Sequence, residues 1–95
     1  MITQEGDRLL LAGPVTIASV TALLAQSRAL LAPGVAVLDF EGVTELDSAA
    51  VALALECLRE ARRQGFSLSL ANLPEAMQNL AELYAVSELL QAAPA

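Results

Sequence analysis

The sequence predicts a small α/β domain in which a mixed β-sheet of about four strands packs with three or four helices. Segments with strand character alternate with segments of helical periodicity in the order β-β-α-β-α-β-α. Residues 35–40 form an apolar run broken at Asp39, which is typical of a strand covered on both faces, and we place it at the sheet centre. The 95 residues suffice for one hydrophobic core. We therefore expect a single domain over residues 1–95, with a frayed tail at 91–95.

The first half of the chain predicts a hairpin, a turn and a helix. Residues 2–5 and 8–12 flank a Gly-Asp pair that favours a hairpin connection, and the Gly-Pro pair at 13–14 predicts a turn. From Thr16 to the Pro-Gly pair at 33–34, apolar residues recur at helical spacing, which predicts a first helix of about four turns. The residues of this helix that we expect in the core are Ile17, Val20, Leu23, Leu24, Leu30 and Leu31.

The second half predicts a loop, two helices and a further strand. Residues 41–46 form the loop, and a second helix runs from Asp47 to Gly65, a residue type that commonly ends helices. Apolar and serine side chains alternate over residues 66–70, so this strand buries one face. Pro74 opens a third helix. We expect the core to contain Val51, Ala54, Leu55, Leu58 and Ala61 from the second helix, and Met77, Leu80, Ala81 and Tyr84 from the third.

Composition and charge exclude several classes of function. Aromatic residues make up 3% of the chain, too few for the stacking platforms that bind single-stranded nucleic acid. The net charge of −6 opposes binding to phosphate backbones or anionic lipid headgroups. The chain has no His or Lys, and Cys57 is its one cysteine, so most acid-base and thiolate-metal chemistry is excluded. We expect a cytoplasmic protein that is not an enzyme and needs no cofactor.

A membrane-spanning segment is the main alternative reading of the hydropathy. Residues 9–27 carry no charge over a length that could nearly cross a bilayer. The Gly-Pro pair at 13–14 and five scattered Ser, Thr and Gln residues argue against a span. We therefore expect a strand, a turn and an amphipathic helix there, and no direct membrane insertion.

The step from the central strand to the second helix holds the candidate site. Asp47 is placed to cap that helix, because its carboxylate can accept from free backbone N–H groups, an effect of roughly 1 to 2 kcal/mol. Ser48 falls just inside the helix, where its hydroxyl can meet a partner or accept a phosphate. Helical geometry turns Ala49, Ala52 and Glu56 away from the expected core, which leaves a flat outer surface. Alanine chosen for helix propensity explains the same pattern equally well.

Other chemistry-bearing residues favour structural roles. Glu41, Glu45 and Asp47 could suggest a cation site, but a solvated acidic loop explains them better, and we predict no metal. Cys57 lacks a basic neighbour and reads as a small buried thiol. The basic helix end formed by Arg59, Arg62 and Arg63 complements the helix dipole, and could also contact the rim of an acidic partner.

A longer pattern through this region resembles STAS domains. It consists of Asp39-Phe40, Val43, Leu46 and Asp47-Ser48. The likeness covers nearly the whole chain. In that family, anti-sigma factor antagonists carry a Ser or Thr at the position of Ser48 that a partner kinase phosphorylates, and MlaB-type subunits bind the ATPase of a phospholipid ABC transporter. The sequence Leu-Ala-Glu-Leu-Tyr-Ala-Val at 80–86 resembles the MlaB branch, whereas Ala50 replaces a glycine usual in the family.

The resemblance implies a non-catalytic protein that binds and regulates the cytoplasmic ATPase of an ABC transporter for phospholipids, which maintains lipid asymmetry. The alternative is an anti-sigma factor antagonist switched by phosphorylation of Ser48, with an anti-sigma factor or kinase as partner. In either case we expect the partner to contact Glu45, Asp47, Ser48, Ala49 and Ala52.

Overall fold

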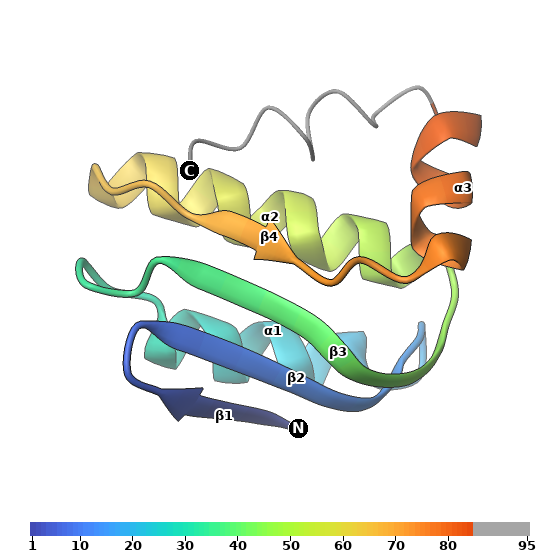
Figure 1. Cartoon of the computed structure of the whole chain (residues 1–95), viewed down its shortest axis with the longest axis horizontal. Coiled ribbons are helices and arrows are strands. Elements are labelled where there is room, and N and C mark those ends of the chain that lie inside the picture. The colour runs from blue at the N-terminus through green and yellow to red at the C-terminus, as the bar shows by residue number, and fades with distance from the viewer. Residues whose placement is uncertain (85–95) are drawn as a thin grey trace.

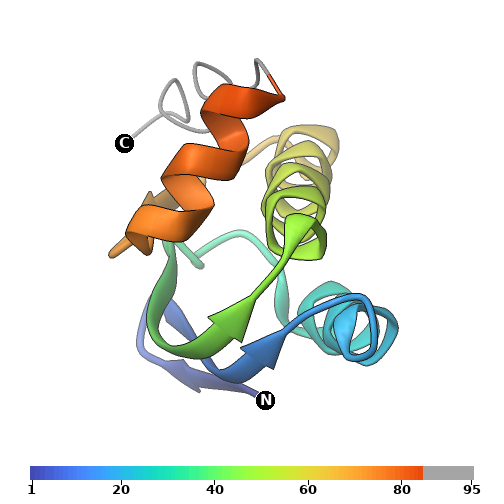
Figure 2. The ribbon, with the colours of Figure 1, turned by 90° about the vertical axis from the view of Figure 1, so that its right-hand side faces the viewer.

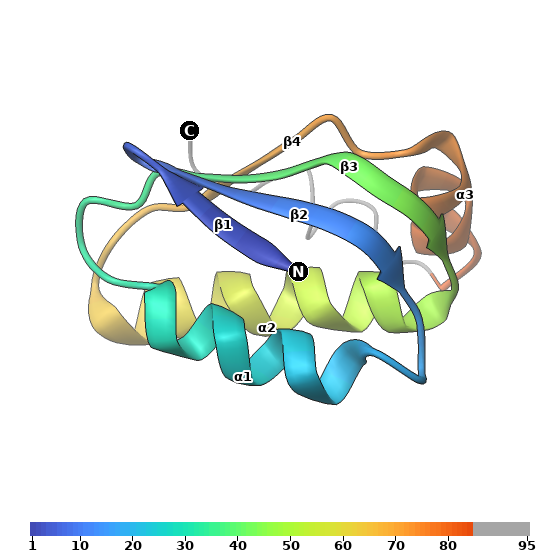
Figure 3. The same ribbon diagram turned by 90° about the horizontal axis from the view of Figure 1, so that it is seen from below.

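The computed structural model describes residues 1–84 as one four-stranded sheet with helices against it (Figure 1). Helices α1 and α2 lie side by side on one face of the sheet (Figure 3), and α3 stands at the end of the sheet near the start of α2 (Figure 2). The predicted α/β class and element order are confirmed. The elements are β1 (Ile2–Glu5), β2 (Arg8–Val15), α1 (Val20–Leu30), β3 (Val37–Leu46), α2 (Ser48–Gln64), β4 (Ser69–Ala71) and α3 (Glu75–Leu83).

The sheet is mixed, with strand order β1-β2-β3-β4. β1 pairs antiparallel with β2 through the predicted hairpin, whereas β2, β3 and β4 run parallel. The central position of β3 explains its apolar run, because Leu38 and Phe40 point into the core and are both 0% exposed. β4 is shorter than the predicted strand at 66–70, and Leu68, just before it, is buried.

β3 continues to Leu46, so the prediction of a loop at residues 41–46 is wrong. The pairing between β2 and β3 shifts twice, between Leu10 and Ala12 and again between Gly13 and Pro14. Each shift leaves an extra residue in β3, which bends the strand as β-bulges do. Such irregular pairing is not visible in hydrophobic alternation, which explains why the sequence reads as a loop here.

The turn predicted at Gly13-Pro14 is also wrong, because β2 runs through both residues to Val15. Gly13 has a φ of 85°, which glycine adopts without the strain that a side chain would add, and this absorbs the second shift. Pro14 lies past the last pairing with β1, where the missing N–H breaks no contact with that strand.

The first helix begins at Val20, four residues later than Thr16, where the periodicity predicted its start. Ser19 holds the preceding turn: its Oγ accepts from the Thr16 N–H at 2.9 Å and donates to the Pro14 carbonyl at 3.0 Å. Ile17 therefore lies outside the helix and is 78% exposed, although its spacing predicted a core position.

The core face of α2 is centred differently from the predicted stripe. Val51, Ala54 and Ala61 are buried as expected, but Leu55 and Leu58 are only partly buried and their places are taken by Leu53 and Cys57. The reason is tertiary, because α2 packs against both α1 and α3 and also lies on one face of the sheet (Figure 3). Burial raises the pKa of the Cys57 thiol to about 11, which fits the predicted inert thiol.

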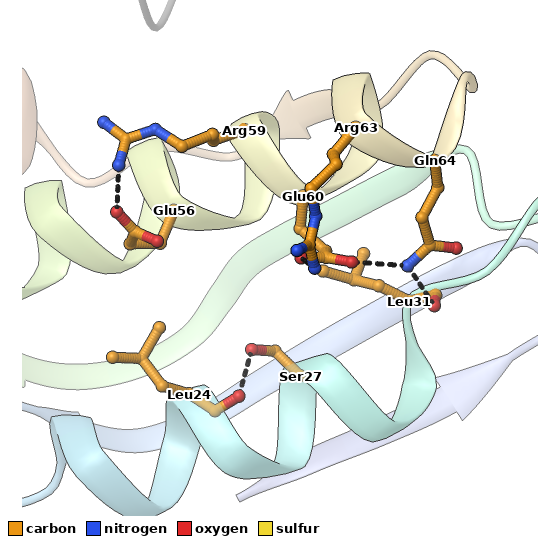
Figure 4. A network of polar contacts seen from close by, with 8 residues as sticks. All are labelled: Leu24, Ser27, Leu31, Glu56, Arg59, Glu60, Arg63 and Gln64. Atoms are coloured by element: carbon orange, nitrogen blue, oxygen red, sulfur yellow. Dashed lines mark hydrogen bonds and ion pairs between the residues drawn. The ribbon is translucent and has the colours of Figure 1, made fainter.

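Polar contacts connect side chains along the C-terminal half of α2, and one of them joins α2 to the end of α1 (Figure 4). Arg59 pairs with Glu56 at 2.7 Å, and Arg63 pairs with Glu60. Gln64 donates both to Glu60 and to the Leu31 carbonyl that ends α1. The helix then ends at Gly65 in a left-handed conformation, as predicted. Two of the three arginines of this basic helix end are thus paired within their own helix.

α3 buries Met77 and Ala81, with Leu80 partly buried, as its spacing predicted. Tyr84 is 51% exposed, so its predicted place in the core is wrong. Tyr84 is the C-cap residue of α3, just past the last helical residue, so helical periodicity does not determine which way its side chain points. The predicted frayed tail at 91–95 lies outside the described residues.

Candidate functional site

Asp47 organises the corner where β3 passes into α2. Its Oδ1 accepts from the Ala49 N–H at 2.8 Å, which confirms the predicted helix cap. Its Oδ2 accepts from the Ile17 N–H at 3.0 Å, and its own N–H donates to the Val15 carbonyl at 3.3 Å. One carboxylate therefore fixes both the start of α2 and the turn before α1. Figure 3 shows these two connections at the same end of the molecule.

Three of the predicted contact residues are exposed at this end. Ser48 is the first residue of α2, and both it and Ala52 face solvent one helical turn apart. Glu45 is exposed near the end of β3, beside Pro14 of β2. Within residues 1–84, the Ser48 hydroxyl takes part in no hydrogen bond. It is thus available to a partner or to a phosphate.

The expectation that Ala49 faces solvent is wrong. Its side chain is 6% exposed, because Ala49 lies one turn before Leu53, on the same side of α2. The error follows from the predicted core stripe, which was centred on Leu55 and Leu58. Ala49 contributes its backbone N–H to the Asp47 cap and its methyl group to the interior.

Ile17 is the exposed residue at this end that hydrophobic periodicity misplaces. The apolar spacing assigned it to the core, yet it projects from the turn that Asp47 and Ser19 hold. A signal was present in the sequence, because Thr16 and Ser19 are residues that form hydrogen-bonded turns before helices. A helix started after Ser19 would have left Ile17 outside it.

Charge is unevenly distributed along the molecule. Arg8 begins β2, Arg28 lies in the last turn of α1, and the remaining three arginines lie in the C-terminal half of α2. Since β2 ends beside Leu46 and α2 starts at Ser48, all five arginines lie toward the opposite end from Ser48. The Ser48 end therefore carries Glu45 and Asp47 without a compensating arginine.

A second aspartate, Asp39, lies near the other end of β3 and is surrounded by a cluster of polar groups. Asp39 is 5% exposed and accepts from Arg8 at 2.6 Å, from the Asn72 side chain at 3.0 Å and from the Glu41 N–H at 2.9 Å. Burial alone would raise the pKa of Asp39, but these hydrogen bonds outweigh it and lower the pKa. Asn72 adopts a φ of 55°, which asparagine tolerates. The cluster ties β2, β3 and the segment after β4 together.

Neither a metal-binding cluster nor a membrane-spanning helix occurs in the described part of the chain. Residues 1–84 contain no group of three His, Cys, Asp or Glu side chains arranged to hold a metal ion. Over the same residues, no helix has the length and apolar character needed to cross a bilayer.

Comparison with known proteins identifies the family. A family model described as "Mlab, STAS domain" matches residues 1–91. The chain therefore belongs to the STAS-domain family of the Mlab type, as the residues around Asp47-Ser48 predicted. STAS domains generally bind partner proteins and are regulatory.

Solved structures show the same fold. The anti-sigma factor antagonist SpoIIAA in its unphosphorylated form is 19% identical, with a TM-score of 0.67, over 92% of this chain and 81% of that chain. A crystal structure of Mglu is 25% identical, with a TM-score of 0.55, over 79% of this chain and 19% of that chain. The search of curated proteins found no match.

Proposed function

We propose that this chain is a non-catalytic STAS protein that binds and regulates the cytoplasmic ATPase of an ABC phospholipid transporter. The observation that carries the proposal is the match of the Mlab family model to residues 1–91. The exposed, uncharged surface formed by Ser48 and Ala52 at the start of α2 supports a role in docking. Residues this small let a partner helix or loop approach the backbone of α2 closely.

The chemistry of the described residues favours binding over catalysis. The chain has no His or Lys to serve as a general base near neutral pH. Both carboxylates fixed by β3 and its end, Asp39 and Asp47, already accept hydrogen bonds. Cys57 is buried with its pKa raised to about 11, so its thiolate is scarce. A regulatory effect then follows from preferential binding to one conformation of the ATPase, which shifts its population toward that state.

The second candidate is an anti-sigma factor antagonist controlled by phosphorylation of Ser48. The exposed hydroxyl of Ser48 is the observation that favours it, and SpoIIAA shares the fold. A phosphate would add up to about two negative charges next to Glu45 and Asp47. The N-terminus of α2 would stabilise part of that charge, but a partner surface matched to the unmodified end would be repelled.

The experiment is affinity capture of the tagged chain from its own cell extract, followed by mass spectrometry. Ser48→Asp is compared with Ser67→Asp, a matched change at an exposed serine before β4. We expect wild type and Ser67→Asp to recover an ABC ATPase, and Ser48→Asp to lose it. Recovery of a kinase or anti-sigma factor instead would support the second candidate. Equal recovery of the ATPase by all three proteins would contradict docking through Ser48.

A further inference from the structure

Ile17 combines high exposure with a fixed backbone. Its side chain is 78% exposed, whereas the other large exposed hydrophobic residues of the described chain, Met1, Leu83 and Tyr84, lie at the ends of that range. Exposed apolar side chains are common singly, so exposure alone means little. What distinguishes Ile17 is how the chain around it is held.

Hydrogen bonds on both sides hold the turn that presents Ile17. The Ile17 N–H donates to Asp47 at 3.0 Å, and the preceding Thr16 N–H donates to the Ser19 hydroxyl at 2.9 Å. The Ser19 hydroxyl in turn reaches the Pro14 carbonyl at 3.0 Å. A β-branched side chain has few rotamers to lose. Ile17 therefore loses little conformational freedom when it is buried by a partner, which favours affinity.

The position of Ile17 joins it to the proposed docking surface. The same Asp47 carboxylate that holds the Ile17 N–H caps the helix that begins with Ser48. Ala18, next to Ile17, and Ala52, one turn after Ser48, are also exposed. The two segments therefore meet at Asp47, and Ile17 is the large exposed apolar side chain beside these small residues.

The negative charge at the Ser48 end determines which charge a partner surface should carry. Glu45 is exposed beside the turn, and all five arginines lie toward the other end of the molecule. An exposed carboxylate beside an apolar protrusion complements an apolar pocket with a basic residue at its rim. An acidic partner would face repulsion here.

Resting on the proposed function, we infer that Ile17 is the anchor of the docking surface. Its side chain inserts into an apolar pocket on the ATPase, and a Lys or Arg at the rim of that pocket faces Glu45. Ser48 and Ala52 supply the flat contact that surrounds the anchor and excludes water.

The test measures the dissociation constant for the purified ATPase subunit by isothermal titration calorimetry. Ile17→Ala should raise Kd at least about 10-fold, and Leu83→Ala, a matched truncation on α3, should change it less than about 2-fold. Ile17→Val should stay within about 3-fold of wild type, whereas Ile17→Thr, which is isosteric with the valine variant but carries a hydroxyl, should lose at least about 10-fold. Thermal unfolding of each variant should match wild type, because this side chain meets mainly solvent in the free protein.

Salt dependence tests the basic rim. Glu45→Gln should weaken binding about 3-fold at low ionic strength, and the difference should vanish at high salt. A Kd for Ile17→Ala within about 2-fold of wild type would overturn the anchor, even when Ser48→Asp loses the ATPase and the proposed function holds. If Leu83→Ala weakens binding and Ile17→Ala does not, the anchor lies on α3. If wild type captures an anti-sigma factor instead, the proposed function fails, and the same series against that protein still tests Ile17.

Discussion

The two ends of β3 each carry an aspartate, but the two aspartates are used differently. Asp39 accepts from two side chains, Arg8 and Asn72, in addition to a backbone N–H. Among residues 1–84, Asp47 accepts from backbone N–H groups alone, those of Ile17 and Ala49. In the first arrangement, the surrounding side chains donate their hydrogen bonds to the aspartate and so stabilise the fold. The second fixes the backbone and leaves the side chains of Ile17 and Ser48 facing solvent.

Under the proposed function, this difference separates an end that stabilises the fold from an end that contacts the partner. At the Asp39 end, polar side chains satisfy one another, so a partner would gain little from them. At the Asp47 end, hydrogen bonds also hold the backbone, but the exposed groups keep their capacity to bind. A preorganised surface with unused side chains is what low-cost association requires.

The largest expected effect comes from Gly42, which lies between the two ends. A Cβ placed there would sit 2.7 Å from the Leu11 carbonyl oxygen, in the backbone of the neighbouring strand. Gly42→Ala should therefore separate β2 from β3 and lower the free energy of unfolding by about 3 kcal/mol. Chemical denaturation measures the loss. An unchanged midpoint would show that the first bulge is not fixed by this contact.

Asp39→Asn should produce the next largest loss, about 2 kcal/mol at neutral pH, because hydrogen bonds to a charged acceptor are replaced by weaker ones. The folded-state pKa of Asp39 lies below its usual value of 3.8, so its stabilisation is present above that pH and disappears as the pH falls through the lower folded value. Unfolding measured from pH 7 downward should show the variant approaching wild type in acid. A constant gap at all pH values would contradict this role.

Asp47→Ala removes both backbone contacts at the proposed docking end and should lower the free energy of unfolding by about 1 kcal/mol. Because the turn bearing Ile17 is then released, affinity for the partner should fall as well, whereas Asp39→Asn, if still folded, should leave affinity unchanged. Denaturation and calorimetry on the same two variants separate the roles. Similar behaviour of both variants in both assays would remove the distinction between the two ends.

The smallest expected effect is that of Asp47→Ser on stability. A serine can still cap α2 through one oxygen, so the free energy of unfolding should change by less than about 0.5 kcal/mol. Because the single serine oxygen is used to cap α2, the Ile17 N–H loses its acceptor. We therefore expect the free energy of binding to fall by more than the free energy of unfolding. If Asp47→Ser raises Kd no more than a neutral surface substitution does, the hydrogen bond from the Ile17 N–H to Asp47 does not preorganise the turn.

Local signals in the sequence predicted much of the fold and part of the site. The Asp47 cap, the Gly65 helix end and the exposed Ser48 all follow from residues close in sequence. Ile17 and Ala49 were misplaced, because periodicity alone cannot show where a turn ends or which side of α2 meets α1 and α3. The bulges that extend β3 to Leu46 depend on pairing with β2, a contact between distant segments. The link from Asp47 to Ile17 spans two such segments and has no local signature.

The affinity of Ala52→Glu for the purified ATPase tests the central claim most directly, since this change alters the docking surface and nothing buried. Ala52 is exposed, so the free energy of unfolding should stay within about 0.5 kcal/mol of wild type. A carboxylate desolvated against the partner should raise Kd at least about 100-fold, whereas the matched Ala32→Glu, exposed beyond the far end of α1, should leave Kd unchanged. Folded Ala52→Glu that binds with the wild-type Kd would contradict the claim that this end of the molecule is the docking surface.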